Sequence, residues 1–196
     1  MRASRPARLI GRLYLRAFGW RVAGTLPCPR AVVIAAPHTS NWDLPFMLAV
    51  AYALGVKPSW LGKRELFRPP FGWFLRLLGG VSVDRRAPQG LVGEAVARFG
   101  EHDDLFLVIP PSGTRARAPY WKSGFYHVAR GAGVPIVCAY LDYRHRVGGV
   151  GLSFVPTASI GADMDRIRAF YADKQAKFPA QVTPVRLREE EETDAA

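Results

Sequence analysis

The segment APHTSNWD, residues 36 to 43, places a histidine and a carboxylate five positions apart, at the end of the apolar run AVVIAA. Histidine exchanges protons near neutral pH, so His38 is a candidate general base. A carboxylate on the second ring nitrogen would fix the imidazole tautomer and favour the imidazolium that forms, and Asp43 is the candidate for this role. Because Thr39 and Ser40 are also good helix caps, the same segment is compatible with an ordinary helix start.

The five-residue spacing restricts how this pair can be arranged. Five residues turn through about 140° around a regular α-helix, so two helical side chains at this spacing cannot share a face. We therefore expect His38 on the loop after the strand and Asp43 inside the first turn of the next helix.

A second set of candidate residues lies in the loop PPSGTRARAPYWK at residues 110 to 122, which follows the apolar run LFLVI. Its glycine and prolines favour tight turns with free backbone donors, and its basic side chains, such as Arg115 and Arg117, supply fixed positive charge. Arginine holds phosphate through two parallel hydrogen bonds, so the loop is typical of a phosphate site. A solvated surface charge is the alternative for each arginine alone. Arg85, after the run GGVSV, adds a further cation.

Apolar runs of strand length alternate with helical patterns from residue 31 onward, which predicts an α/β fold: a single domain with a largely parallel mixed sheet flanked by helices. Ligands bind at the carboxyl ends of strands in such sheets, where His38, Arg85 and the loop at 110 to 122 are all expected. The predicted strands are 31 to 36, 58 to 62, 79 to 84, 105 to 109, 134 to 141 and 150 to 155, and the predicted helices are 6 to 19, 44 to 54 (beginning near 41 to 43), 70 to 78, 91 to 99, 123 to 132 and 163 to 177.

The charge of the chain favours anionic partners. The 196 residues carry a formal net charge of +11, and an acidic tail ends the chain, so the preceding part is more basic still. A positive electrostatic field of this kind attracts nucleic acid, an anionic membrane surface or phosphorylated substrates. We expect no nucleic-acid binding, because the sequence has no finger, basic zipper or RNP-like aromatic motif.

The sequence suggests three regions. Residues 1 to 22 contain a basic amphipathic helix with Arg8, Arg12 and Arg16 on one side and apolar residues on another. The pattern is typical of a helix that lies in the interface of a membrane. It is equally typical of a helix that packs on the domain with its arginines solvated. Residues 23 to 188 form the predicted main domain, and residues 189 to 196 form an acidic tail that is predicted to be disordered.

No membrane-spanning or export segment is expected. The longest uncharged apolar run, residues 44 to 56, is well short of the roughly 20 residues that a spanning helix needs. Arginines interrupt the N-terminal apolar residues, which disfavours a signal peptide. Cys28 and Cys138 have no metal-ligand spacing. We therefore expect a cytoplasmic protein, peripheral on the inner face of the cell membrane.

Four segments in order resemble the glycerolipid acyltransferase family typified by bacterial lysophosphatidic acid acyltransferases. They are HTSNWD with its HxxxxD signature, GKRELFRPPFGWFLRLLGGVSVDR at 62 to 85, PSGTR at 111 to 115 and VPIVCAYLDY at 134 to 143. The resemblance implies the fold of that family and a place in phospholipid biosynthesis. It also implies transfer of a fatty acyl group from an acyl-CoA or acyl carrier protein thioester to the hydroxyl of a lysophospholipid or related polar lipid.

The resemblance further implies roles for residues at matching positions. His38 would be the general base and Asp43 would hold its imidazole, with no acyl-enzyme because the thioester is already activated. Arg85 and Arg115 match positions associated with phosphate binding, and Gly113 would let the loop backbone approach the phosphate. No cofactor or metal is implied beyond the acyl thioester co-substrate. The remaining implied acceptor-site residues are Lys63, Ser112 and Thr114.

One position departs from the family pattern. The third segment of the family normally reads Pro-Glu-Gly-Thr-Arg, and Ser112 stands here in place of the glutamate. A carboxylate that could bind a glycerol hydroxyl or brace the arginines is thereby replaced by a short neutral hydroxyl. The substitution is compatible with an altered acceptor and with a catalytically weakened or inactive lipid-binding member of the same fold.

Overall fold

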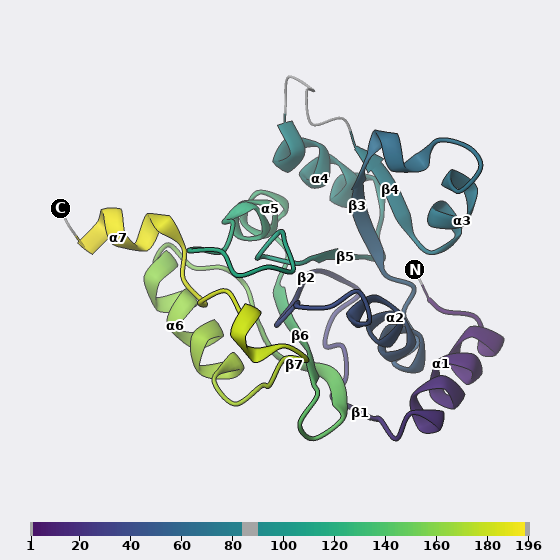
Figure 1. The fold of residues 1–196 in the computed structure, drawn as a ribbon. Coiled ribbons are helices and arrows are strands. Elements are labelled where there is room, and N and C mark those ends of the chain that lie inside the picture. Colours follow the sequence, from purple (N-terminus) through teal and green to yellow (C-terminus); the bar gives the residue numbers. More distant parts are fainter. Residues whose placement is uncertain (1, 84–89, 195–196) are drawn as a thin grey trace.

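Seven strands among the described residues form one mixed sheet, which has helices on both faces (Figure 1). The computed structural model describes residues 2–83 and 90–194. The strands are β1 (Arg21–Ala23), β2 (Arg30–Ala35), β3 (Ser59–Lys63), β4 (Gly80–Val83), β5 (Leu105–Ile109), β6 (Ile136–Asp142) and β7 (Val147–Phe154). The helices are α1 (Arg5–Ala17), α2 (Asp43–Ala53), η1 (Arg64–Phe67), α3 (Gly72–Leu77), α4 (Gly90–Glu101), α5 (Gly124–Ala132), α6 (Ile160–Tyr171), η2 (Pro179–Gln181) and α7 (Arg188–Asp194).

The strand order is β1-β7-β6-β2-β5-β3-β4. The pairs β2–β5, β2–β6, β3–β4 and β3–β5 are parallel, whereas β6 and β7 are antiparallel. Strands β2 and β5 therefore lie next to each other with their carboxyl ends at the same edge. The predicted α/β class with a largely parallel mixed sheet is confirmed.

The central strand β2 is buried on both faces, which explains its continuous apolar sequence. Val32 and Ile34 pack into a core formed with α4, α5 and α6. Val33 points to the opposite face, where it joins a smaller cluster that includes Phe106 and Val150. Helix α2 covers part of this second face, and space remains between the helix and the sheet.

Helix α2 begins at Asp43, with Pro45 in its first turn, where proline removes no intrahelical hydrogen bond. Helix α1 packs against α2 so closely that a Cβ atom on Gly11 would lie 2.6 Å from the carbonyl oxygen of Ala49. The predicted start of this helix near residues 41 to 43 and the predicted location of Asp43 in its first turn are confirmed. The N-terminal helix is thus attached to the domain by its Gly11 face.

The structure differs from the prediction at strand β1, on the edge of the sheet, and at both ends of helix α6. The suggested region boundary between residues 22 and 23 falls inside β1, a three-residue strand that pairs with β7. Helix α6 begins earlier than expected because the Ser159 hydroxyl caps it by accepting from the amide of Ala162. It ends at Tyr171, so residues 172 to 177 leave the predicted helix.

The acidic segment forms helix α7 over Arg188–Asp194, where the sequence predicted disorder. The glutamates have specific partners on the domain. Glu189 accepts from the Ser123 hydroxyl, Glu190 pairs with Arg168 at 2.6 Å, and Glu191 accepts from the Tyr120 hydroxyl at 2.8 Å. Pairing with hydroxyl and guanidinium groups relieves the repulsion between adjacent carboxylates that the composition implied.

In the part of the chain that the structure describes, no helix combines the length and the apolar composition needed to span a bilayer. The same residues contain no group of three or more His, Cys, Asp or Glu side chains arranged to hold a metal ion.

Candidate active site

His38 and Asp43 meet at the carboxyl end of β2. Nδ1 of His38 lies 2.9 Å from Oδ2 of Asp43. The histidine side chain is 18% exposed and the aspartate side chain 1% exposed, so one partner faces the site and the other lies beneath it. An ionised carboxylate only accepts hydrogen bonds, which assigns the proton to Nδ1 and leaves the lone pair on Nε2.

Asp43 is held as a buried carboxylate by several donors. Its Oδ2 accepts hydrogen bonds from the backbone amides of Thr39 and Ser40, both at 2.9 Å. Burial by itself would raise the pKa of Asp43, but the hydrogen bonds from His38, Tyr143 and the two amides outweigh it and hold the pKa below its ordinary value. Asp43 therefore stays charged at neutral pH while it both organises the turn and orients the imidazole.

Tyr143 is a third residue of the site, and sequence reasoning missed it. Its hydroxyl donates to Oδ1 of Asp43 at 2.7 Å, the oxygen next to the one that holds His38. Burial and this hydrogen bond raise the pKa of Tyr143, so the phenol keeps its proton. Tyr143 directly follows β6, which neighbours β2 in the sheet. The rule that functional side chains gather at parallel strand ends could have identified it.

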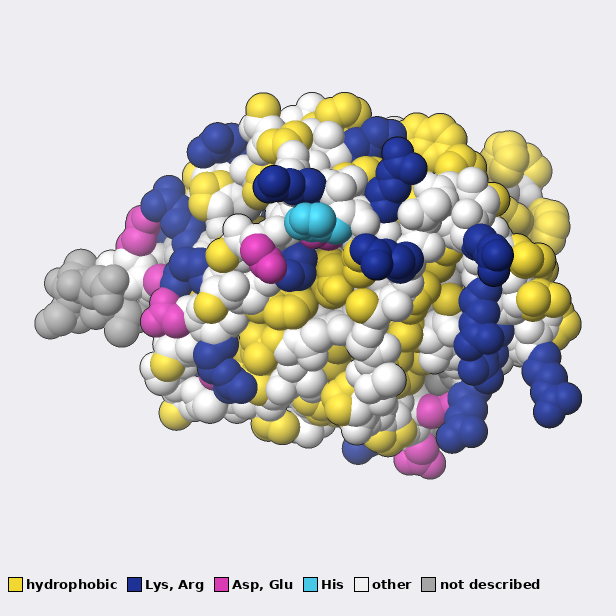
Figure 2. Space-filling model, turned by 90° about the horizontal axis from the view of Figure 1, so that it is seen from below, with side chains coloured by type: hydrophobic (Ala, Val, Ile, Leu, Met, Phe, Trp, Pro, Cys, Tyr) yellow, Lys and Arg dark blue, Asp and Glu magenta, His cyan; other side chains and the backbone are white. Residues whose placement is uncertain are grey.

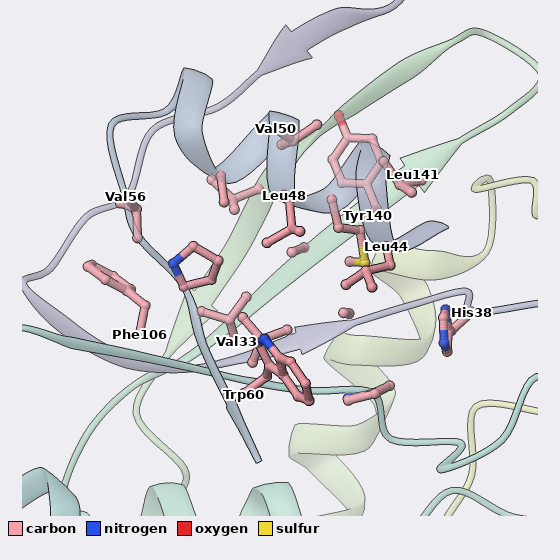
Figure 3. A pocket seen from close by; sticks show the side chains of 18 of the residues that line it. Val33, His38, Leu44, Leu48, Val50, Val56, Trp60, Phe106, Tyr140 and Leu141 are labelled. Atoms are coloured by element: carbon pink, nitrogen blue, oxygen red, sulfur yellow. The ribbon is translucent and has the colours of Figure 1, made fainter. Parts of the chain in front are cut away.

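A cavity of about 460 Å³ lies between α2 and the sheet, with His38 at one end. This volume is within the range of about 300–1,000 Å³ found for small-molecule sites. In the close-up of Figure 3, His38 lies at one end and Val56 and Phe106 at the other, with apolar side chains between them. Besides His38, the polar residues that line the cavity include Asn41 and Arg115.

The apolar lining is drawn from both layers. Helix α2 contributes Leu44, Leu48 and Ala51, whereas the sheet contributes Val33 and Val108. The cavity is therefore an elongated apolar space that begins beside an imidazole. Such a space suits a hydrocarbon chain whose reactive end is at His38.

The predicted acceptor residues in the loop after β5 line two different hollows. Arg115 lines the cavity that contains His38. Ser112 is buried, and its hydroxyl donates to the carbonyl oxygen of Thr114 at 2.8 Å. Gly113 has a φ of +65°, and its backbone lies against the Lys122 side chain. Ser112, Gly113 and Thr114 line a separate hollow of about 510 Å³ that also includes Arg188 and Glu189.

For two of the predicted site residues, the structure describes no side-chain position. Arg85 falls outside the described residues, and Lys63 ends β3 with a side chain that is not described. Of the predicted set, the structure thus brings together His38, Asp43 and Arg115. Chemically, the arrangement provides a base, its buried orienting carboxylate, a cation and an apolar cavity.

The Acyltransferase family model matches residues 20–142, a range that includes His38, Asp43 and Arg115. The chain is 33% identical over 151 residues to a 1-acyl-sn-glycerol-3-phosphate acyltransferase of Haemophilus influenzae, a match that covers 71% of this chain and 60% of that protein. It is 31% identical over 87 residues to the protein of the same name from Streptococcus pneumoniae, covering 42% and 31% of the two chains. The chain therefore matches less than two thirds of the length of either relative.

The fold is similar to the crystal structure of the 1-acyl-sn-glycerophosphate (LPA) acyltransferase PlsC from Thermotoga maritima. The TM-score is 0.58 at 18% sequence identity, and the match covers 86% of this chain and 75% of that chain. The family model spans more than half of the chain, and it includes the histidine–aspartate pair whose geometry is described above. The resemblance inferred from the four segments is confirmed, and the chain belongs to the Acyltransferase family.

Proposed function

We propose that the chain transfers a fatty acyl group from an acyl-CoA or acyl carrier protein thioester to the hydroxyl of a 1-acylglycerol 3-phosphate or a related polar lipid. The observation that carries this proposal is the contact between His38 and Asp43 at one end of an apolar cavity. The names of the two relatives support the substrate class.

In the proposed reaction, Nε2 of His38 removes the proton from the acceptor hydroxyl as its oxygen attacks the thioester carbonyl carbon. Asp43 stabilises the imidazolium that forms, because its charge lies 2.9 Å from Nδ1. The carbon–sulfur bond then breaks, an ester bond remains, and the thiolate leaves. The thiolate takes the proton back from His38, so the enzyme returns to its starting state.

An assay with labelled acyl thioesters and a panel of hydroxyl acceptors tests this proposal. The panel contains 1-acylglycerol 3-phosphate, other lysophospholipids and monoacylglycerol, each with acyl-CoA and with acyl carrier protein donors. We expect an ester product from at least one phosphate-bearing acceptor. Absence of product across the whole panel, from folded protein, would contradict the enzymatic proposal.

A weakened, lipid-binding member of the fold is the second candidate, and Ser112 favours it. Ser112 replaces the family's glutamate, and its hydroxyl is already engaged with Thr114. The two candidates differ in one outcome of the panel. A lipid-binding protein would retain lysolipid in an equilibrium binding assay yet form no ester product with either donor.

Arg115 is proposed to hold the acceptor phosphate at the histidine end of the cavity. Replacing Arg115 with alanine is expected to raise the KM for 1-acylglycerol 3-phosphate by about 10- to 100-fold, because charge-assisted hydrogen bonds contribute about 1.5–3 kcal/mol each. The KM for monoacylglycerol, which has no phosphate, should change little. Arg117→Ala removes an exposed arginine of the same loop and is the matched control. A wild-type KM in Arg115→Ala would contradict the assignment.

We infer that an anionic membrane surface, as on the inner face of the cell membrane, is the second partner. Helix α1 buries Gly11 and Leu15, yet its apolar residues Leu9, Ile10 and Leu13 remain 56–65% exposed. Trp73 in helix α3 is 68% exposed, and Phe71, directly before that helix, is 71% exposed. Both helices lie on the same side of the molecule in Figure 1, and Figure 2 has basic side chains beside hydrophobic ones on that side.

A helix binds a bilayer interface by burying apolar side chains and by electrostatic attraction to anionic lipids, and exposed apolar residues beside arginines can make both interactions. Replacing Ile10 with glutamate is expected to weaken binding to vesicles of mixed phosphatidylcholine and phosphatidylserine by about tenfold or more, because burying such a side chain contributes about 1.5–3 kcal/mol. Vesicle flotation at low and high salt measures this change. Val155→Glu is the matched control, since Val155 is 61% exposed and lies after β7. Equal losses in both variants would contradict the proposed surface.

A further inference from the structure

The segment between α6 and α7 ties the histidine turn to the arginine loop. We call residues 177 to 181 the C-terminal strap. The amide of Phe178 donates to Oγ1 of Thr39 at 3.2 Å, directly beside His38. The Gln181 side-chain amide, in the orientation that satisfies its neighbours, donates to the carbonyl oxygens of Thr39 at 3.0 Å and of Arg115 at 3.1 Å. The strap is thereby fixed against both halves of the site.

Lys177 is the one cation in the C-terminal strap, and it lies beside the histidine–aspartate pair. Its Nζ is 5.3 Å from the centre of the Trp42 ring and 6.0 Å from that of the Tyr143 ring. Trp42 immediately precedes Asp43, and Tyr143 donates its hydroxyl hydrogen to Asp43. The Phe178 ring lies 5.8 Å away on a further side. The ammonium group is therefore positioned by three aromatic rings, two of which belong to residues that adjoin Asp43.

Among the described residues, no carboxylate lies within ion-pair distance of Lys177. The aromatic rings do not accept conventional hydrogen bonds from its ammonium group. Lys174 provides a direct contrast. Its Nζ also lies over two rings, those of Tyr140 and Phe170, yet it forms an ion pair with Asp173. An ammonium group has three donors, and cation–π attraction alone leaves them available. Lys177 thus has the charge and the free donors to bind an anion.

We propose that Lys177 binds a phosphate group of a substrate next to His38. This inference rests on the proposed acyl transfer and names a binding residue that the family resemblance did not include. Two substrates of that reaction carry phosphate: the lysophospholipid acceptor, and the donor, through coenzyme A or the phosphopantetheine arm of a carrier protein. The shared chemistry is a phosphate ester held by a lysine that aromatic side chains keep in place.

Steady-state kinetics of Lys177→Met and Lys177→Arg test the site. Methionine preserves the apolar stem over the rings and removes the charge, and arginine preserves the charge. We expect Lys177→Met to raise the KM of one substrate by about tenfold or more, with kcat within about threefold and with most of the effect rescued in Lys177→Arg. Lys174→Met, which also removes a lysine from two rings, should leave both KM values unchanged.

Separate arms identify the source of the phosphate. A rise confined to the acceptor KM, and absent when monoacylglycerol replaces 1-acylglycerol 3-phosphate, assigns Lys177 to the acceptor. A rise confined to the donor KM assigns it to the thioester. Equilibrium binding of coenzyme A and of lysophosphatidic acid to the same variants provides a readout without turnover. If wild-type protein binds either ligand but forms no product, the proposed function fails and the binding comparison still tests Lys177. Unchanged affinity for both ligands in folded Lys177→Met would overturn the inference.

Discussion

Replacing His38 with alanine is expected to lower kcat for acyl transfer by about 10² to 10⁴-fold, the contribution that a positioned general base typically makes. The acceptor hydroxyl then has no base within reach as it attacks the thioester. The KM for the acceptor should change much less, because in the proposed site the phosphate is held by Arg115 rather than by the imidazole. Initial rates with labelled acyl thioester, measured at saturating acceptor, provide the comparison.

A matched control exists for this substitution because the chain has a second histidine–aspartate pair. Nδ1 of His145 lies 2.6 Å from Oδ2 of Asp142, but His145 is 59% exposed and does not line the cavity. His145→Ala therefore removes the same type of contact without removing the proposed base. A similar rate loss in His38→Ala and His145→Ala would show that the pair at the cavity has no special role in the reaction.

The pair of His38 and Asp43 could be predicted because its geometry is local. Both residues belong to one strand–turn–helix connection, so spacing alone restricts their arrangement. Tyr143 lies 100 residues further along the chain, and its hydrogen bond to Asp43 depends on β6 pairing with β2. A strand-end position indicates that a side chain is near the site, but it does not identify which carboxylate oxygen the side chain will contact.

The fold was predictable where apolar runs are long and less so at the edges. The apolar run of β2 predicts a buried central strand, which the structure contains. Strand β1 has three residues, two of them exposed, so no periodic pattern marks it. Helix α7 has a composition typical of disorder, and it forms where the domain supplies partners such as Arg168 and Tyr120. These partners are far apart in sequence and cannot be recognised from the acidic run itself.

The cavity could not be predicted from any one segment, because its walls come from α2 and from several strands of the sheet. The sequence indicates that Val33 and Leu48 are apolar, but not that space remains between them. The C-terminal strap is a similar case. The pattern from 163 to 177 predicted a continuous helix, whereas the chain leaves α6 at Tyr171 and brings Lys177 to the aromatic rings beside Asp43.

Replacing Val56 with tryptophan is expected to shorten the acyl chain that the enzyme accepts. Val56 lies at the end of the cavity away from His38 (Figure 3), so a bulky side chain there should fill the space proposed for the end of a long chain. Each methylene that can no longer be buried loses about 0.8 kcal/mol. If the indole displaces three or four methylenes, kcat/KM for the longest acyl donors should fall by about 10²-fold.

The diagnostic result is a change in the profile of kcat/KM against acyl length, measured with saturated thioesters from short to long chains. Short donors should react with Val56→Trp at nearly the wild-type rate, because the His38 end of the cavity is unaltered. Val155→Trp adds the same side chain at an exposed position that does not line the cavity. A parallel loss at every chain length in Val56→Trp would indicate a general packing defect. An unchanged profile would mean that the acyl chain binds outside the space between α2 and the sheet.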